Sequence, residues 1–597
     1  MFYAPLAVRF AGASWVSWVP GAEPTRRLFR RLAVPLLLLL CLTLAALGSP
    51  KLRADEAMDA FQKGAAAFEN KAYDLAIADY SETIRLSPSC ELAYFGRALA
   101  YFRKGDNNRG IADCSATLRL KPDFAMAYLN RGTAYLTIGD YDRAIADCSE
   151  TLRLDSRSVE AFNSRGLAYE KKNDYDRAIA DFSEALRLNP ASVDAWNNRG
   201  RVYERKGDHG RAVADWSEVV RLNPKSAEVY LLRGFAYDGK GDHKRAIADF
   251  SAMIRLYPKS ANAYASRGAV YLKMGDHEQA IADISEALRI DPHSAEACFS
   301  RGAVYEEKGD HARAIADYGE TLRLKPDFAL AYAARGRLYL KLGDYERAIA
   351  DFTALLRLEP KSPEAVYLVR GFAYDGKGDH ARAITDFNEA LRLNHGLAEA
   401  FRGRGRAYEG SGDHDRSIAD CSEALRLNPG SVDSYLDQSL AYLNKGDCER
   451  AIADCNVALR LNPSCAMAYN NRGFACKKKG DYGRAIADYR EAVRLNPKFD
   501  LAYDNLAWVL ATAPEEKFRN GRQAVEYATR ACELPQGKKW VETLAVAHAE
   551  MGNFTEAVKW EQEYLDSNPG AADAEQARQR LRMFQAGKAY HEERESM

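Results

Sequence analysis

The chain has 597 residues, too many for one compact domain, so it divides into several domains or into repeats that pack only on their neighbours. Lysine plus arginine and aspartate plus glutamate both number 84, and the formal net charge is zero. This balance provides no net field that would attract nucleic acid, so we expect no nucleic-acid partner.

Residues 1–54 are predicted to be an N-terminal extension that directs export. Four arginines between residues 26 and 31 precede a leucine-rich apolar run over 32–48. A basic flank before an apolar run of this length is typical of a secretory signal peptide. The run is short for a membrane span, which needs about 20 residues, and the alternative is an uncleaved inner-membrane anchor. We therefore expect an exported protein that is periplasmic or anchored to the inner membrane through this segment.

A unit of about 34 residues recurs over residues 55–500. Its marker is the aspartate of the sequence AIAD or a close variant, and one step of 35 interrupts the regular spacing. The marker occurs thirteen times, at Asp79, Asp113, Asp147, Asp181, Asp215, Asp249, Asp283, Asp317, Asp351, Asp386, Asp420, Asp454 and Asp488. A fixed period of this length with two helical patterns per unit is typical of a solenoid of helix pairs.

Each unit predicts two helices joined by a tight turn. Glycine followed by aspartate, as at Gly207 and Asp208, ends the first helix and caps the second. Proline stops the second helix because it cannot continue one. The marker residues keep a fixed order, seen in one unit at Phe162, Gly166, Tyr169, Ala178, Phe182 and Pro190.

This order of residues at this spacing resembles the tetratricopeptide repeat (TPR) family, and the resemblance covers about residues 55–585. It implies an all-α fold, an α-α superhelix built as a right-handed solenoid of about 15 helix-turn-helix repeats. Thirteen regular repeats are expected over 55–500 and two divergent repeats over 501–569. A capping helix and tail are expected over 570–597, since Leu581, Met583 and Phe584 would otherwise face water.

One arginine per repeat stands in the first helix, where an apolar residue is expected. Arg165 lies about eight residues before the turn and Asp181 about eight after it, so an antiparallel pair places them at the same height. The predicted structural ion pairs are Arg165 with Asp181, Arg199 with Asp215, and Arg233 with Asp249. Two alternatives stay open: Arg165 reaches Asp147 of the preceding unit, or Arg177 on the same helix is the main partner of Asp181.

No catalytic, cofactor-binding or metal-binding residue is predicted. Six units carry a histidine after the Gly-Asp turn, but equivalent helices lie at least about 8–10 Å apart, too far for one zinc ion to bind two of them. These histidines are interpreted as packing residues: His209, His243, His277, His311, His380 and His414. A disulfide among Cys448, Cys465 and Cys476 is left open.

By the resemblance, the first helices line a concave groove that binds peptides or partner proteins. In the first three repeats the lining positions are apolar: Phe61, Phe68, Phe95, Leu99, Phe102, Leu129 and Leu136. The alternative is that residues before 58 cover this apolar strip. We therefore expect a non-enzymatic scaffold or adaptor that binds proteins or peptides in the groove. The alternative function is a noncatalytic subunit of an envelope enzyme or of an export or assembly machine.

Overall fold

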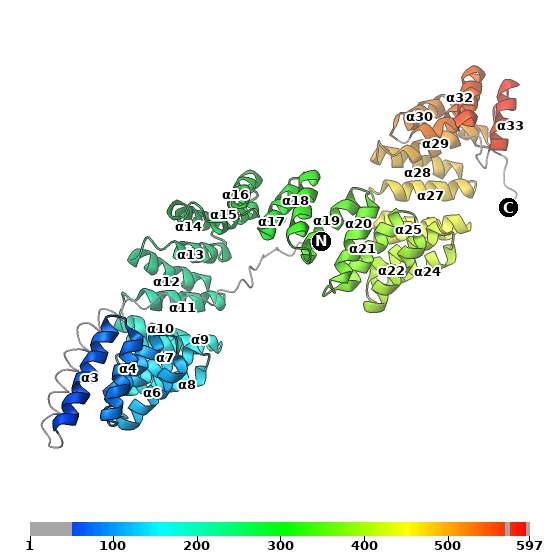
Figure 1. Ribbon diagram of the computed structural model, residues 1–597. Helices are drawn as coiled ribbons and strands as arrows, with labels where there is room; N and C mark the ends of the chain where they lie inside the picture. The colour runs from blue at the N-terminus through cyan, green and yellow to red at the C-terminus, as the bar shows by residue number, and fades with distance from the viewer. Residues whose placement is uncertain (1–50, 536, 568–573, 593–597) are drawn as a thin grey trace. The chain divides into compact units, whose positions relative to one another are not determined.

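A computed structural model describes residues 51–535, 537–567 and 574–592 of the chain. Within these ranges the backbone forms 31 α-helices, two short 3-10 helices and no β-strand. The predicted all-α helical-repeat fold is confirmed (Figure 1). The apolar run 32–48, predicted to be a signal peptide or membrane anchor, lies outside the described residues. No described helix combines the length and the apolar character that a membrane crossing requires.

The described residues up to Ile290 form a compact unit of seven antiparallel helix pairs. We name the first helix of each pair helix A and the second helix B. The pairs are α3 (Lys51–Glu69) and α4 (Tyr73–Leu86), α5 (Glu91–Arg103) and α6 (Asn107–Leu120), α7 (Ala125–Thr137) and α8 (Tyr141–Leu154), α9 (Val159–Lys171) and α10 (Tyr175–Leu188), α11 (Val193–Arg205) and α12 (His209–Leu222), α13 (Ala227–Gly239) and α14 (His243–Leu256), and α15 (Ala261–Lys273) and α16 (His277–Ile290).

A second compact unit begins at Asp291 and contains eight helix pairs and one further helix within the described ranges. The regular pairs are α17 (Ala295–Glu307) and α18 (His311–Leu324), α19 (Ala329–Lys341) and α20 (Tyr345–Arg357), α21 (Pro363–Gly376) and α22 (His380–Leu393), α23 (Ala398–Gly410) and α24 (His414–Leu427), α25 (Val432–Lys445) and α26 (Cys448–Leu461), and α27 (Ala466–Lys478) and α28 (Tyr482–Leu495). The divergent pairs are α29 (Asp500–Thr512) and α30 (Gly521–Glu533), and α31 (Val541–Glu550) and α32 (Phe554–Ser567); α33 (Ala574–Gln585) follows.

The turn between helix A and helix B is built from two adjacent residues. In the pair α11 and α12, Gly207 adopts a φ of 77°, a left-handed conformation that ends helix A at little steric cost. The carboxylate of the next residue, Asp208, accepts a hydrogen bond from the backbone N–H of Arg211 at 3.1 Å and caps helix B. This turn recurs in most regular repeats, whereas the first has Lys71 and Ala72 and the fourth has Asn173 in place of the glycine.

Small residues of one helix receive large residues of the other, so each repeat has a core of its own. In the pair α9 and α10, Ala178 and Phe182 are fully buried. A Cβ atom on Gly166 would lie 2.8 Å from the ring of Phe182, so only glycine permits this close approach of the two helices. The hydrophobic core is therefore a row of small clusters along each unit.

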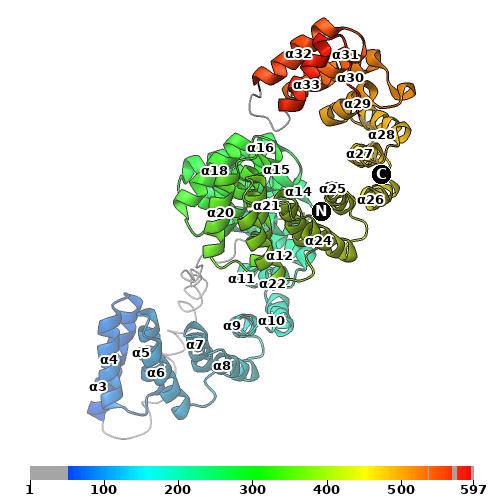
Figure 2. The ribbon, with the colours of Figure 1, turned by 90° about the vertical axis from the view of Figure 1, so that its right-hand side faces the viewer.

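Within each unit, every helix A packs on its own helix B, and every helix A after the first also packs on the helix B of the preceding repeat. In part of each unit, successive A helices also contact each other, as α5 contacts α7 and α21 contacts α23. Figures 1 and 2 show consecutive helices of each unit lying side by side. Contacts between successive A helices place these helices on the more closely spaced, inner side of each stack. This side is where the sequence predicts the binding surface.

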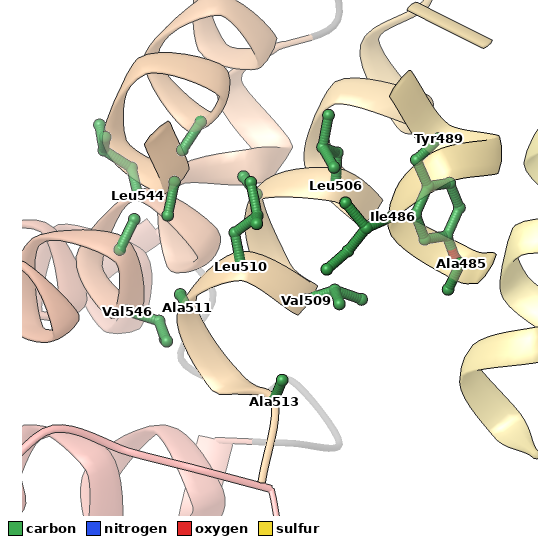
Figure 3. Close-up of a cluster of buried hydrophobic side chains, with 14 of the residues drawn as sticks. Ala485, Ile486, Tyr489, Leu506, Val509, Leu510, Ala511, Ala513, Leu544 and Val546 are labelled. Carbon is green, nitrogen blue, oxygen red and sulfur yellow. The ribbon is translucent and has the colours of Figure 1, made fainter. Parts of the chain in front are cut away.

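The divergent C-terminal repeats share one larger core. Leu506, Val509 and Leu510 of α29 are buried between α28 and α31 (Figure 3). The chain between α29 and α30 includes a 3-10 turn at Glu516–Phe518. Phe584 of α33 is 1% exposed and joins the same core, so α33 covers the apolar surface of the last repeat.

The ten cysteines within the described ranges are free thiols, including Cys448, Cys465 and Cys476. Burial raises the pKa of Cys114 to about 12, so this thiol in helix B packs as a small apolar group.

Candidate functional site

The recurring arginine of helix A forms an ion pair with the marker aspartate of its own repeat. Arg165 Nη2 and Nε lie 2.7 and 2.8 Å from the two carboxylate oxygens of Asp181. The same bidentate geometry joins Arg199 to Asp215 and Arg233 to Asp249. The three aspartates are 3–5% exposed, so without these partners each would hold an uncompensated buried charge.

A third nitrogen of the same guanidinium reaches the preceding repeat. Arg165 Nη1 donates to Ser149 Oγ at 3.1 Å, so the arginine ties its own two helices to the helix B before them. The preceding Asp147, weighed as a partner of Arg165, is instead held by Arg131 of its own repeat at 2.7 Å. The serine that stands two residues after most of the marker aspartates is the sequence signal for this joint. It recurs at Ser81, Ser115, Ser149, Ser183, Ser217 and Ser251, each bonded to the next arginine.

Arg177 does not pair with Asp181, so that alternative is wrong. Its guanidinium lies against Asp174, the residue that caps helix B, and its backbone N–H donates to the same carboxylate at 3.3 Å. The Arg177 side chain is 67% exposed. This arginine therefore supports the cap at the surface, while Arg165 neutralises the buried aspartate.

Two regular repeats keep the aspartate but lack the arginine: the first repeat, which has Lys63 there, and the repeat that contains α25. Gln438 stands in place of the arginine on α25 and donates to Ser422 Oγ at 2.6 Å, so the joint to the preceding repeat is retained. Asp454 on α26 loses its ion pair, and one of its carboxylate oxygens has no hydrogen-bond partner among the described residues. Burial raises the pKa of Asp454 to about 7.

We expect Gln438→Arg to stabilise the chain by about 1–2 kcal/mol at pH 8, because the new guanidinium pairs with Asp454 as in the other repeats. The folded pKa of Asp454 lies above its unfolded value, so its ionisation destabilises the wild type as pH rises toward 7. The gain should therefore shrink at pH 5, where Asp454 is protonated. Urea denaturation at the two pH values measures it. Leu440→Arg adds the same charge at an exposed position of α25 and should give no comparable gain.

The residues left for function form a stripe along helix A. The position directly after the recurring glycine or alanine is partly or fully exposed in every regular repeat from the second on. It holds Leu99, Thr133, Leu167, Arg201, Phe235, Ala269, Ala303, Arg337, Phe372, Arg406, Leu440 and Phe474. We call this position, with the positions four residues before and three residues after it, the helix-A face. The spacing keeps all three on one side of the helix.

The seven predicted groove residues lie on this face, but two of them are core residues. Phe61 is 9% exposed and packs edge-on against Tyr80, with ring centres 5.6 Å apart. Phe95 is 8% exposed and packs against Phe124 at 4.8 Å. The expectation that both line an open apolar strip is wrong, because neighbouring aromatic rings already cover them.

The other five are half-buried: Phe68, Leu99, Phe102, Leu129 and Leu136. Phe102 turns toward its own helix B, where Gly110 replaces the usual alanine. A Cβ atom on Gly110 would lie 2.2 Å from the Phe102 ring, so the ring fills the space that glycine leaves. These five residues keep part of their surface on the helix-A face and stay candidates for partner binding.

Four of the six histidines after the Gly-Asp turn pair with acids of their own helix A. His209 Nδ1 lies 2.9 Å from Glu204, and His243 Nδ1 lies 3.0 Å from Asp238. His380 and His414 make the same contact to Asp375 and Glu409. An acid stands five residues before each of these four histidines, but it does not ensure the pairing, because Glu306 before His311 accepts from Tyr318 instead. No group of three or more His, Cys, Asp or Glu side chains in the described ranges is arranged to hold a metal ion.

Charged groups on the helix-A face are paired between successive repeats. Glu170 is fully buried, and Arg201 of the next repeat lies 3.1 Å from both of its carboxylate oxygens. Asp375 likewise meets Arg406 of the next repeat at 3.4 Å. Such a face offers hydrogen-bond donors in fixed positions, and it can hold polar or acidic groups of a bound segment.

Four protein-family models match the chain, and all four carry the description Tetratricopeptide repeat. One such model matches residues 61–123, 95–159, 163–216, 205–261, 368–432 and 515–572, more than half of the chain. Three others with this description match 261–294 and 466–499, 329–362, and 295–328 and 432–465. No curated protein matches the chain.

Solved structures with the same repeat pattern include MamA from Desulfovibrio magneticus RS-1, at 24% identity over 28% of this chain and 96% of that chain, with a TM-score of 0.28. YrrB, described as a TPR protein with an unusual peptide-binding site, is 24% identical over 31% and 95% of the two chains, with a TM-score of 0.29. The Cut9–Hcn1 assembly of APC/C is 16% identical over 79% and 98%, with a TM-score of 0.34. On the matched repeats and the helix pairs that they form, this chain belongs to the tetratricopeptide repeat family.

Proposed function

We propose that this chain is a non-enzymatic scaffold whose helix-A face binds segments of partner proteins. Membership of a repeat family that serves in protein interaction supports the general role. The observation that carries the proposal is the contrast between positions within one chain. Glycine, arginine and aspartate recur because they hold the stack together, whereas the exposed position after the glycine changes between Leu, Thr, Arg, Phe and Ala. Architecture alone does not require that variety.

We also propose that the protein acts in the cell envelope, periplasmic or anchored to the inner membrane. The basic and leucine-rich segment over 26–48 supports this location. The second candidate function, a noncatalytic subunit of an envelope enzyme or of an export or assembly machine, uses the same face to hold a larger assembly together. The paired charges at Glu170 and Arg201 favour a partner with polar groups over a purely apolar one.

A photo-crosslinking residue placed at Arg337 tests the proposed face. Arg337 is exposed on α19, the helix A of its repeat. Arg323 is exposed on α18, the helix B of the preceding repeat, and is paired with Glu320. We expect position 337 to crosslink a specific polypeptide and position 323 not to do so. Calorimetry with the purified partner should then show at least about tenfold weaker binding for Arg337→Ala, which corresponds to about 1.4 kcal/mol, and no change for Arg323→Ala. Equal crosslinking at both positions, or equal affinity of both variants, would contradict the proposal.

A further inference from the structure

The C-terminal tail contacts the A helices of the last three repeats. After α33, Gly587 takes a φ of 68° and the described tail continues without helix to residue 592. His591 Nε2 lies 2.7 Å from Glu550 at the end of α31. Glu592 then contacts both α29 and α27. The tail therefore bridges α27, α29 and α31, the A helices of three successive repeats.

The Glu592 residue is held by three different groups. The indole N–H of Trp508 donates to Glu592 Oε1 at 2.7 Å, and Lys477 Nζ lies 3.0 Å from the same oxygen. The backbone N–H of Glu592 donates to the carbonyl oxygen of Thr512 at 2.9 Å. That carbonyl belongs to the last turn of α29, where helix carbonyls lack partners within the helix.

These binding groups occupy positions of the helix-A face. Trp508 is the equivalent of Phe474 one repeat earlier, and Lys477 lies three residues after Phe474. The face that the proposed function assigns to partners is thus already used, at its C-terminal end, by a segment of the chain itself. The recognition chemistry of that end can be read from the bound tail.

A second contact lies beside the first. The Tyr590 ring packs on the C-terminal core and lies 5.8 Å from the guanidinium of Arg580. Arg580 is 3% exposed and donates to Glu561 at 3.0 Å, so its position is fixed by the protein and not by the tail. An aromatic ring two residues before a carboxylate therefore meets a surface that is built in advance.

We propose that the helix-A face of α27 and α29, together with the C-terminal end of α31, is a docking site for an extended partner segment with an aromatic residue two positions before an acidic one. The inference rests on the proposed function. It adds the chemistry of the bound segment and a way in which the chain's own tail regulates binding. In the free chain, Tyr590 to Glu592 occupy the site, and the partner segment binds by displacing them. The tail competes with the partner segment because its attachment to the same chain gives it a high effective concentration at the site.

The expected competition follows from exposure and charge. The Lys477 and Glu592 side chains are 19% and 24% exposed, so their contact is open to water at one edge and can exchange. The apolar residues beneath the site, Leu506 and Leu510, are buried by neighbouring helices. Release of the tail therefore leaves the helix stack in place and exposes a cation, an indole N–H and a helix carbonyl.

A labelled peptide with the sequence of residues 586–597 serves as the probe, titrated by fluorescence anisotropy into the full-length chain. Glu592→Ala in the protein weakens the internal competitor, so we expect the peptide to bind this variant at least about tenfold more tightly than wild type. Adding Lys477→Ala to the Glu592→Ala protein should reverse this gain in affinity. A peptide in which alanine replaces the glutamate of position 592 should bind the Glu592→Ala protein at least about tenfold more weakly than the unchanged peptide. Glu575→Ala, which removes an acid of α33 paired with Arg578, is the matched control and should behave as wild type.

Three outcomes overturn the inference. Equal affinity for wild type and Glu592→Ala, or no binding to either, shows that the tail is a fixed cap. Unchanged binding after Lys477→Ala in a folded protein, as judged by circular dichroism, places the peptide elsewhere. A wild-type dimer that Lys477→Ala dissociates in sedimentation shows a tail exchanged between two copies. None of these results decides the crosslinking test at Arg337, so failure of this site and failure of the proposed function are distinguishable.

Discussion

Arg233→Ala should lower the free energy of unfolding by about 3 kcal/mol at pH 8. The substitution removes both hydrogen bonds to Asp249, which is 5% exposed, and the contact to Ser217 of the preceding repeat. Breaking a buried pair from one side typically costs about 3–5 kcal/mol, and the 15% exposure of the arginine side chain places the loss at the lower end. A repeat can unfold locally together with its neighbours, so one global measurement is not enough. The loss is therefore measured by urea denaturation and also by hydrogen exchange in α13 and α14.

Arg245→Ala is the matched control on the facing helix. Arg245 is 67% exposed and lies 3.5 Å from Asp242, so its loss should cost about 0.3–0.5 kcal/mol. The wild type already contains a marker aspartate without its arginine. Asp454 stands opposite a glutamine, and its pKa is raised to about 7. Asp249 in the Arg233→Ala variant should behave in the same way. The deficit of Arg233→Ala should therefore shrink at pH 5, as the unpaired Asp249 takes up a proton. Equal small losses for both variants would show that the interhelical ion pair has no such role.

The sequence favoured Asp181 as the partner of Arg165 because of antiparallel geometry, but it left Asp147 and Arg177 open as alternatives. Arg165 and Asp181 are equally far from a short turn, so any packing of the two helices brings them level. The serine that completes the joint was missed, although it recurs with the same period, because a short hydroxyl side chain has many alternative partners. Periodic, local features of this fold are therefore predictable from one sequence.

Features that depend on single rings or on distant contacts were not predictable. The burial of Phe95 depends on Phe124 in the following turn, at a position that is aromatic in only a few repeats, as at Phe328 and Phe499. The contact between Trp508 and Glu592 joins residues 84 apart and follows no period. A binding surface is harder to predict than the stack that carries it, since each repeat is free to vary there.

Asp504→Asn should raise the free energy of unfolding by up to about 4 kcal/mol at pH 8, the opposite of most changes in a buried core. Asp504 of α29 is 8% exposed, and one of its carboxylate oxygens has no hydrogen-bond partner among the described residues. Burial raises its pKa from an ordinary value near 3.8 to about 7, despite the hydrogen bond with Thr543. Each unit of difference between the folded and unfolded pKa corresponds to about 1.4 kcal/mol, which sets the upper figure.

The sign of the pH dependence distinguishes this effect from better packing. The folded state holds the proton more tightly than the unfolded state, so the contribution of Asp504 to stability is complete below about pH 4 and is lost as pH rises to about 7. Asparagine does not titrate, so its advantage should be largest above pH 7 and nearly absent at pH 4. Hydrogen exchange in α29 to α31 across this range gives the local free energy. Asp488→Asn, which breaks the pair with Arg472, should instead destabilise the chain at pH 8. An Asp504→Asn protein less stable than wild type at pH 8, or an advantage that persists unchanged at pH 4, would show that burial does not raise the pKa of Asp504 in the folded chain.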